Sequence, residues 1–142
     1  ARDLGFSYVE LDGEIGVICN GAGLTMATMD LVKHYGGRPA NFLDIGGGAN
    51  AERVEKAVRL LLQKEGVKVV FVNVLGGITR CDEVALGLVR AMRDVGRGVK
   101  LVVRLVGTRE EEGQRILREN GYEFFRSMEE AARRAVELSS LA

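Results

Sequence analysis

The chain has 142 residues, 46% of them hydrophobic, which suits one domain with a core of its own. Its 20 Lys and Arg residues balance 20 Asp and Glu residues, and this neutrality argues against a nucleic-acid-binding protein, whose surface is usually basic. Two cysteines and one histidine are too few for a disulfide scaffold or an ordinary four-ligand zinc site, and no apolar run resembles a membrane span or a signal peptide.

Strand and helix patterns alternate along the chain. Residues 8–11 and 14–19 predict a β-hairpin, because the Asp12-Gly13 dipeptide between them is typical of a two-residue turn. The helices that follow show apolar residues at helical spacing, and the later strands are nearly continuous β-branched and apolar runs. Helices are predicted at residues 24–35, 51–65, 82–95, 108–120 and 127–138, and strands at residues 41–45, 67–75, 99–105 and 123–125.

Three of these helices carry start signals. Asn50 stands directly before the second helix as an N-cap residue. Residues 108–111 (Thr-Arg-Glu-Glu) and 127–130 (Ser-Met-Glu-Glu) fit the capping-box pattern, in which a hydroxyl and a carboxylate satisfy backbone N–H groups at a helix start. They mark where the second helix and the last two helices begin.

The order of the elements predicts an α/β fold. Strands separated by helices of about 10–15 residues are joined by right-handed crossovers, which gives a parallel sheet with helices on both faces. For five parallel strands we expect the flavodoxin-like order 2-1-3-4-5, with the N-terminal hairpin strand as an addition. Residues 1–142 show no internal repeat and no linker, so they are predicted to form a single domain.

Glycine is unusually frequent, at 19 of 142 residues, and its clusters follow predicted strands at residues 21–23, 46–48, 76–77 and 107. The carboxyl ends of parallel strands share one edge of the sheet, where ligands bind. Glycine lets backbone N–H groups approach an anion, and a helix N-terminus adds partial positive charge. Tight turns that need positive φ are the simpler explanation for one cluster. Several clusters on one edge favour a rim for a phosphate or carboxylate.

Three polar residues are placed near this rim by their positions at strand ends. The amide of Asn20 can contact a small ligand or form an Asx-type turn. Arg80 lies in the first turn after Gly76-Gly77, where it can face an anion, a partner's acid or solvent. Arg104 lies near the end of the fourth parallel strand. These alternatives stay open at the level of sequence.

Other candidate residues do not support catalysis or dinucleotide binding. Cys19 and Cys81 have no neighbouring histidine to activate them and are predicted to be buried thiols, and His34 lies late in its helix, away from the rim. The glycines at 21–23 with Asp44 imitate a dinucleotide fingerprint, but Met26 stands where that motif needs Gly or Ala. A receiver domain is also excluded, since no acidic pair ends the first parallel strand.

Three longer motifs are much more specific than a glycine-rich loop. They read Asn-Gly-Ala-Gly-Leu at residues 20–24, Gly-Arg-Pro-Ala-Asn-Phe-Leu-Asp-Ile-Gly-Gly-Gly-Ala at 37–49, and Gly-Gly-Ile-Thr-Arg-Cys-Asp at 76–82. In order and spacing they resemble the β subunits of succinate–CoA ligases (succinyl-CoA synthetases). The resemblance covers essentially the whole chain and corresponds to the C-terminal flavodoxin-like ligase domain of those subunits.

The resemblance implies part of an enzyme that joins succinate and CoA with hydrolysis of a nucleoside triphosphate, through a phosphorylated histidine. It places Mg²⁺ and ATP or GTP in an N-terminal ATP-grasp part that this chain lacks, and CoA and the histidine in an α subunit, in an αβ or α2β2 assembly. It therefore implies no catalytic residue, metal or cofactor in this chain and no activity of the chain alone. It also implies a cytoplasmic or mitochondrial-matrix location, without nucleic-acid or membrane partners.

The same resemblance assigns the site residues. It gives Asn20, Gly77, Ile78 and Thr79 to the succinate site, and it points the helix N-terminus at Gly76, Gly77 and Arg80 toward the phosphorylated histidine. Because an α subunit would cover this rim, we expect Ile78 to be exposed in this chain, and we expect the first N–H groups of that helix to be open to water or an anion.

Three positions depart from the family pattern. Thr79 stands where Val is more common, Val106 where Glu is expected, and Arg109 where Asn is common. These departures leave the fold intact but leave open the dicarboxylate that is bound and the details of the contact with the α subunit. The alternatives are the corresponding domain of a malate–CoA or citrate-cleaving ligase, and a non-catalytic domain that only docks a partner.

Overall fold

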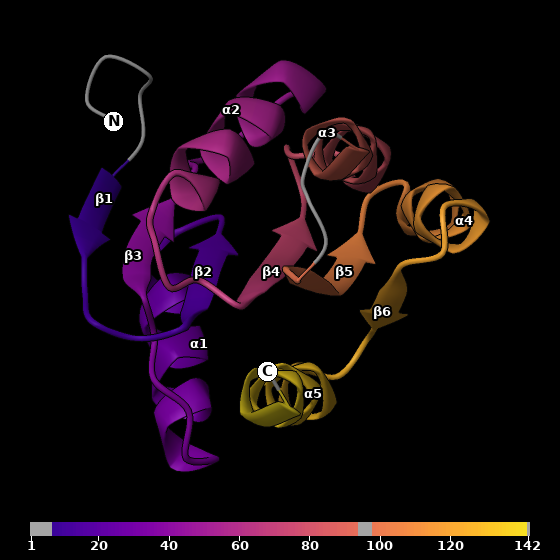
Figure 1. The fold of residues 1–142 in the computed structure, drawn as a ribbon. Helices are drawn as coiled ribbons and strands as arrows, with labels where there is room; N and C mark the ends of the chain where they lie inside the picture. The colour runs from indigo at the N-terminus through magenta and orange to yellow at the C-terminus, as the bar shows by residue number, and fades with distance from the viewer. Residues whose placement is uncertain (1–6, 94–97, 142) are drawn as a thin grey trace.

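The computed structural model describes residues 7–93 and 98–141, which form one six-stranded sheet with helices on both faces (Figure 1). The strands are β1 (Ser7–Glu10), β2 (Ile15–Cys19), β3 (Asn41–Asp44), β4 (Val69–Gly76), β5 (Lys100–Gly107) and β6 (Glu123–Phe125). The helices are α1 (Ala22–His34), α2 (Ala51–Leu62), α3 (Cys81–Arg93), α4 (Glu110–Glu119) and α5 (Met128–Leu141). The end of the predicted helix at 82–95 lies outside the described residues.

The predicted order of the five parallel strands is confirmed. The sheet runs β1-β3-β2-β4-β5-β6, so the parallel strands, counted along the chain from β2, are ordered 2-1-3-4-5. Figure 1 shows α2, α3 and α4 on one face of the sheet and α1 and α5 on the other. The chain reverses its direction of winding between β2 and β4, and this is where such sheets form their ligand crevice.

The predicted N-terminal hairpin is wrong. Strand β1 pairs antiparallel with β3, from Ser7 opposite Asp44 to Glu10 opposite Asn41, and not with β2. Both edges of β2 are occupied by β3 and β4, so β1 can join the sheet only at the free edge of β3. Gly13 is needed for close approach, because a Cβ there would lie 1.9 Å from the carbonyl oxygen of Arg38.

The sheet separates two apolar cores because alternate residues of a strand point to opposite faces. Val70 and Val72 of β4 join the core under α2, α3 and α4. Phe71 between them is fully buried in the core under α1 and α5, together with Val17 and three alanines of α5. The small alanine side chains let α5 lie close to the strands. Among the helices that the structure describes, none has the length and hydrophobicity needed to cross a bilayer.

Two of the three predicted helix starts are confirmed by their hydrogen bonds. The Asn50 side chain accepts from the backbone N–H of Arg53 at 2.9 Å, and the Ser127 hydroxyl accepts from that of Glu130 at 3.2 Å. The capping box at 108–111 does not form. Arg109 takes the N-cap position in a left-handed conformation, with φ of 61°, and the Thr108 hydroxyl donates instead to the carbonyl of Gly77 at 3.0 Å.

Candidate functional site

The loops at the carboxyl ends of the strands meet at one edge of the sheet, as predicted, and Asn20 joins two of these strands. Its side-chain Nδ2 donates to the carbonyl of Leu75 at 2.9 Å, and its Oδ1 accepts from the Leu75 N–H at 3.1 Å. The amide thus continues the pairing of β2 with β4 beyond the last residue of β2. One N–H and one oxygen lone pair remain for a ligand.

Asp44 organises this rim, a role that its place in the apparent dinucleotide motif does not indicate. Its Oδ1 accepts from the N–H of Gly21 at 2.7 Å and from that of Gly46 at 2.8 Å. The carboxylate therefore fixes the loop after β2 and the loop after β3 relative to each other. An acidic residue at a strand end, separated by one residue from a run of glycines, is the sequence signal for this role.

Thr79 connects the loop after β3 with the loop after β4. Its side chain is 1% exposed, and its hydroxyl accepts from the backbone N–H groups of Gly48 at 2.8 Å and Ala49 at 3.3 Å. A valine at this position would have no oxygen to accept these bonds, so the threonine hydroxyl has a structural role here. The structure places Thr79 beneath the rim surface and not on it.

Ile78 and Leu75 are the apolar residues that the rim exposes beside its glycines. Ile78 is 87% exposed, as expected from the sequence, and Leu75 is 53% exposed. Gly77 next to Ile78 is exposed and has open space where a side chain would be. Its conformation does not require glycine, since its φ is not in the left-handed region. The structure therefore brings Asn20, Gly77 and Ile78 together at the surface.

The N-terminus of α3 is less open than expected. The N–H of Cys81 donates to the carbonyl of Thr108 at 2.8 Å. The Arg80 guanidinium lies 2.6 Å from a carboxylate oxygen of Asp82, and this contact lowers the pKa of Asp82, with a smaller contribution from N–H groups at the start of the helix. The helix start thus holds a carboxylate of its own, and Arg80 pairs with that carboxylate.

Arg104 lies at the same edge of the sheet as the rim, on the face that carries α1 and α5, and takes part in a chain of hydrogen bonds. Its Nε donates to the carbonyl of Arg126 at 3.0 Å and its Nη1 to Oδ1 of Asn73 at 3.2 Å. Asn73 in turn donates to the Thr28 hydroxyl at 2.8 Å. Burial, and secondly the charge of Arg126, lower the pKa of Arg104. This network ties β5 to β4 and α1.

The thiols and the histidine lie where the sequence predicted. Cys19 and Cys81 are buried, and burial raises the pKa of Cys19 to about 12 and that of Cys81 to about 11, which keeps both protonated at neutral pH. His34 ends α1, away from the rim, with its ring against Tyr35. Within residues 7–93 and 98–141, no three His, Cys, Asp or Glu side chains are grouped so that they could hold a metal ion.

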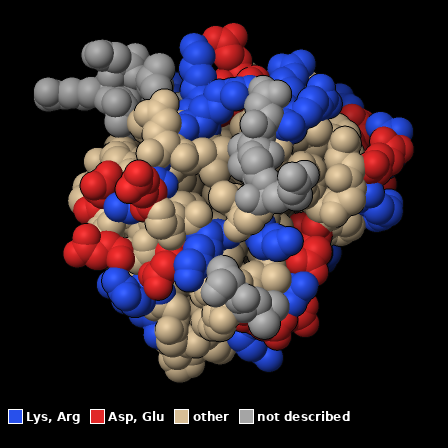
Figure 2. Space-filling view, in the orientation of Figure 1, with Lys and Arg blue, Asp and Glu red and all other residues tan. Residues whose placement is uncertain are grey.

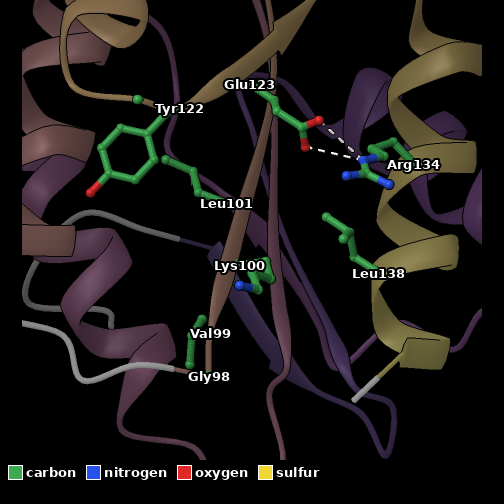
Figure 3. Close-up of a pocket in the computed structure, with 9 residues that line it drawn as sticks. Gly98, Val99, Lys100, Leu101, Tyr122, Glu123, Arg134 and Leu138 are labelled. Atoms are coloured by element: carbon green, nitrogen blue, oxygen red, sulfur yellow. Dashed lines mark hydrogen bonds and ion pairs between the residues drawn. The ribbon is translucent and has the colours of Figure 1, made fainter.

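A hollow of about 540 Å³ lies at the opposite edge of the sheet, by the amino ends of β5 and β6 and the side of α5. Figure 3 shows Tyr122 and Arg134 on opposite sides of the strand that carries Leu101, with Arg134 bonded to Glu123. Arg134 in the hollow is paired with Glu123, whereas Lys100 also lines it and has no ion pair among the described residues. On the face shown in Figure 2, basic and acidic side chains are likewise interspersed. The rim remains the better candidate site.

Comparison with known proteins bears on the family of the chain and not on the roles of single rim residues. A sequence model described as CoA-ligase matches residues 18–138, which include every strand from β3 to β6 and the whole rim. The chain belongs to the CoA-ligase family. The matched residues include Asn20 and all the glycine loops at the carboxyl ends of the parallel strands.

Relatives of this CoA-ligase domain are named as β subunits. The chain is 62% identical over 140 residues to the protein named succinate–CoA ligase [ADP-forming] subunit β of Pyrobaculum aerophilum, and 60% identical over 139 residues to that of Staphylothermus marinus. These alignments cover 98% of this chain, but the chain spans only 37% of the length of each relative. The chain thus corresponds to a part of those proteins.

The fold of the CoA-ligase domain is also found in a solved structure. ATP citrate lyase from Methanothrix soehngenii, in complex with citrate and coenzyme A, superposes with a TM-score of 0.82 over 96% of this chain and 44% of that protein. The sequence identity is 17%, so this likeness supports the fold alone.

Proposed function

We propose that this chain is the ligase domain of the β subunit of a succinate–CoA ligase. It would supply the rim to an αβ enzyme that forms succinyl-CoA with hydrolysis of a nucleoside triphosphate. The observation that carries the proposal is the identity of 60–62% over 98% of this chain to proteins with that name. The rim adds a physical reason, because its exposed backbone, amide and apolar side chain suit a ligand shared with a partner subunit.

In this proposal the rim binds and orients a carboxylate and holds it near a transferred phosphoryl group. The remaining N–H of Asn20 donates to the carboxylate. The N–H groups of Gly77 and Ile78 make no backbone hydrogen bond within the described residues and are available for the same purpose. Fixed donors of this kind stabilise developing negative charge without reorganisation during the reaction. Thr79 and Asp44 act one step away, by fixing the loops.

The other groups of the reaction are assigned to parts outside this chain. In this proposal the metal and ATP or GTP belong to the remaining length of the longer protein, as the family resemblance implies. CoA and the phosphorylated histidine belong to the α subunit, and exposed Ile78 is the apolar contact offered to it. A cytoplasmic location stays a prediction.

The test is reconstitution of the longer β protein with its α subunit, followed by measurement of CoA-dependent ADP or GDP release with succinate, malate or citrate as the acid. We expect turnover with succinate, and a fall of about tenfold or more in kcat/KM for Asn20→Ala, because one charge-assisted hydrogen bond is lost. Preference for malate or citrate would assign the chain to a related ligase. Turnover with none of the three acids would leave only a docking role.

The 142-residue chain alone should show no turnover under the same conditions, because its one histidine, His34, lies at the end of α1 away from the rim, and the proposal assigns the nucleotide site to the remaining length of the longer protein. The matched sample is the same chain mixed with the α subunit. A clear rate from the isolated chain would contradict the proposal.

A further inference from the structure

We propose that Arg104, together with the exposed side chain of Leu75 and the half-buried side chain of Val106, binds a carboxylate that comes from outside these 142 residues. The source is either an acidic side chain of the partner subunit or a small carboxylic acid, and the chemistry is the same in both: a carboxylate on an apolar carbon chain. The inference rests on the proposed function, since it needs a partner or substrate at this edge.

The first support is the state of the guanidinium. Arg104 is partly buried, and two of its three nitrogens are committed to Arg126 and Asn73. Its Nη2 makes no hydrogen bond, and no carboxylate lies within ion-pair distance, among the residues that the structure describes. The hydrogen bonds to the Arg126 carbonyl and the Asn73 amide fix the plane of the guanidinium, so its free N–H groups point in a defined direction.

The second support is that nearby acids have other partners. Glu110 and Glu129 are close enough to act on Arg104 electrostatically. The carboxylate of Glu110 is bonded to Arg126 at 2.5 Å and to the N–H of Gly107 at 3.1 Å. Glu129 accepts from the Ser127 hydroxyl. A partly desolvated cation without an ion pair is costly, and a carboxylate from outside would offset that cost.

The third support is the surface beside the cation. Val106 lies two residues beyond Arg104 on the same face of β5, and Leu75 of β4 is its register partner. Strand β2 ends at Cys19, opposite Asn73, and strand β6 ends at Phe125, opposite Arg104. The last residues of β4 and β5 therefore extend beyond both neighbouring strands. The exposed Leu75 shows that no helix covers this face there.

This site adjoins the rim and shares Leu75 with it, but its side chains lie on the other face of the sheet from the start of α3. The side chain of Asn20 bonds to the backbone of Leu75, in the plane of the sheet. Ile78 and the start of α3 follow β4 toward the opposite face, where Cys81 is buried with the residues of α2 and α4. Arg104 points to the face that carries α1 and α5, beside Asn73 and above Phe71.

The test uses the longer β protein and its α subunit, with two variants that act differently. Arg104→Met removes the charge and keeps much of the side-chain length. Val106→Glu keeps the arginine network intact and supplies a carboxylate two residues away on the same face, which competes with the external group. Val106→Gln has the same shape as the Glu variant without its charge and reports the effect of bulk alone.

Two quantities are measured for each variant: the Kd between the subunits, by calorimetry, and the KM for succinate. A carboxylate of the partner predicts that Arg104→Met raises the subunit Kd by about tenfold, and that Val106→Glu raises it well beyond Val106→Gln, with KM unchanged. If the carboxylate belongs to a small acid, Arg104→Met raises the KM for succinate by about tenfold, and Val106→Glu raises it well beyond Val106→Gln. The Kd between the subunits then stays unchanged.

The proposal is overturned if both quantities stay within twofold for Arg104→Met, or if the Glu and Gln variants of Val106 behave alike. If Arg104→Met fails to fold, the comparison of Val106→Glu with Val106→Gln still tests the proposal. A wild-type complex without succinate-dependent turnover, whose subunit Kd nevertheless responds to Val106→Glu, would refute the proposed function and leave this site standing.

Discussion

Single residues of the rim show which structural features could be expected from the sequence and which could not. Exposure of Ile78 could be predicted because a family resemblance places it under a partner, and it is 87% exposed. The roles of Asn20, Asp44 and Thr79 depend on which loops touch in three dimensions, and these contacts span 23 to 55 positions in the chain. No local pattern contains that information.

Arg109 carries the backbone strain of the loop before α4. It is the one non-glycine residue with positive φ among the described residues, at 61°. Arg109→Gly and Arg109→Ala both lose the ion pair with Glu112, so their difference isolates the strain. We expect the glycine variant to be more stable by about 1 kcal/mol in urea unfolding. An alanine variant of equal or higher stability would show that the loop relaxes.

Glu110 joins this loop to the start of α5 through Arg126, and the contact gives stability a pH dependence. The Arg126 guanidinium lowers the pKa of Glu110 below its ordinary value of 4.5. Its contribution is therefore present above the pKa of the unfolded chain and is lost as pH falls through the lower folded pKa.

Glu110→Gln should thus unfold at lower urea concentration than the wild type at pH 7, and the difference should shrink below about pH 4.5. Glu111→Gln, one residue along on the exposed side of α4, removes the same charge without an ion pair and serves as the control. A difference for Glu110→Gln that stays constant from pH 7 to pH 3 would contradict this assignment.

At the scale of elements, the crossing of α3 over α2 depends on Gly87. A Cβ at Gly87 would lie 2.4 Å from the carbonyl oxygen of Ala51 and 2.8 Å from Cβ of Val54. Helix propensity alone predicts that Gly87→Ala stabilises α3 by up to about 1 kcal/mol. The steric conflict involves backbone and a buried side chain, so we expect a net loss of about 1–3 kcal/mol.

Gly23→Ala is the matched control for this prediction. Gly23 is also helical, in α1, but nothing lies within 4 Å of the position that an alanine methyl group would take, and its φ is not positive. Its replacement should therefore be neutral or slightly stabilising in the same urea unfolding experiment. If Gly87→Ala were as well tolerated as Gly23→Ala, the two helices would not be in the close contact described.

Elements were predictable where local sequence decides and not where pairing decides. The buried runs in β4 and β5 and the apolar stripe of α2 identify these elements without ambiguity. The partner of β1 is set by which sheet edge is free, and the Asp12-Gly13 dipeptide says nothing about that. The failed capping box before α4 has a similar cause, since Thr108 is drawn to the carbonyl of Gly77 across the loop.

At the scale of the whole molecule, the fold follows from alternation and handedness. Right-handed crossovers and helices on both faces leave few arrangements for five parallel strands, and the observed order is among them. The same topology brings the glycine loops to one edge and leaves β4 and β5 extending beyond their neighbours. Both the rim and the surface beside Arg104 are consequences of this topology.

The most direct test of the rim is the activity of the reconstituted αβ enzyme with Gly77→Val, compared with Gly47→Val. Both glycines are exposed, lack positive φ and have open space around them, so neither change should alter unfolding by more than about 1 kcal/mol. We predict that Gly77→Val lowers kcat/KM for succinate by about a hundredfold, because the ligand is displaced from its donors, while Gly47→Val has little effect. Full activity of Gly77→Val, or an equal loss in Gly47→Val, would contradict the assignment of the site.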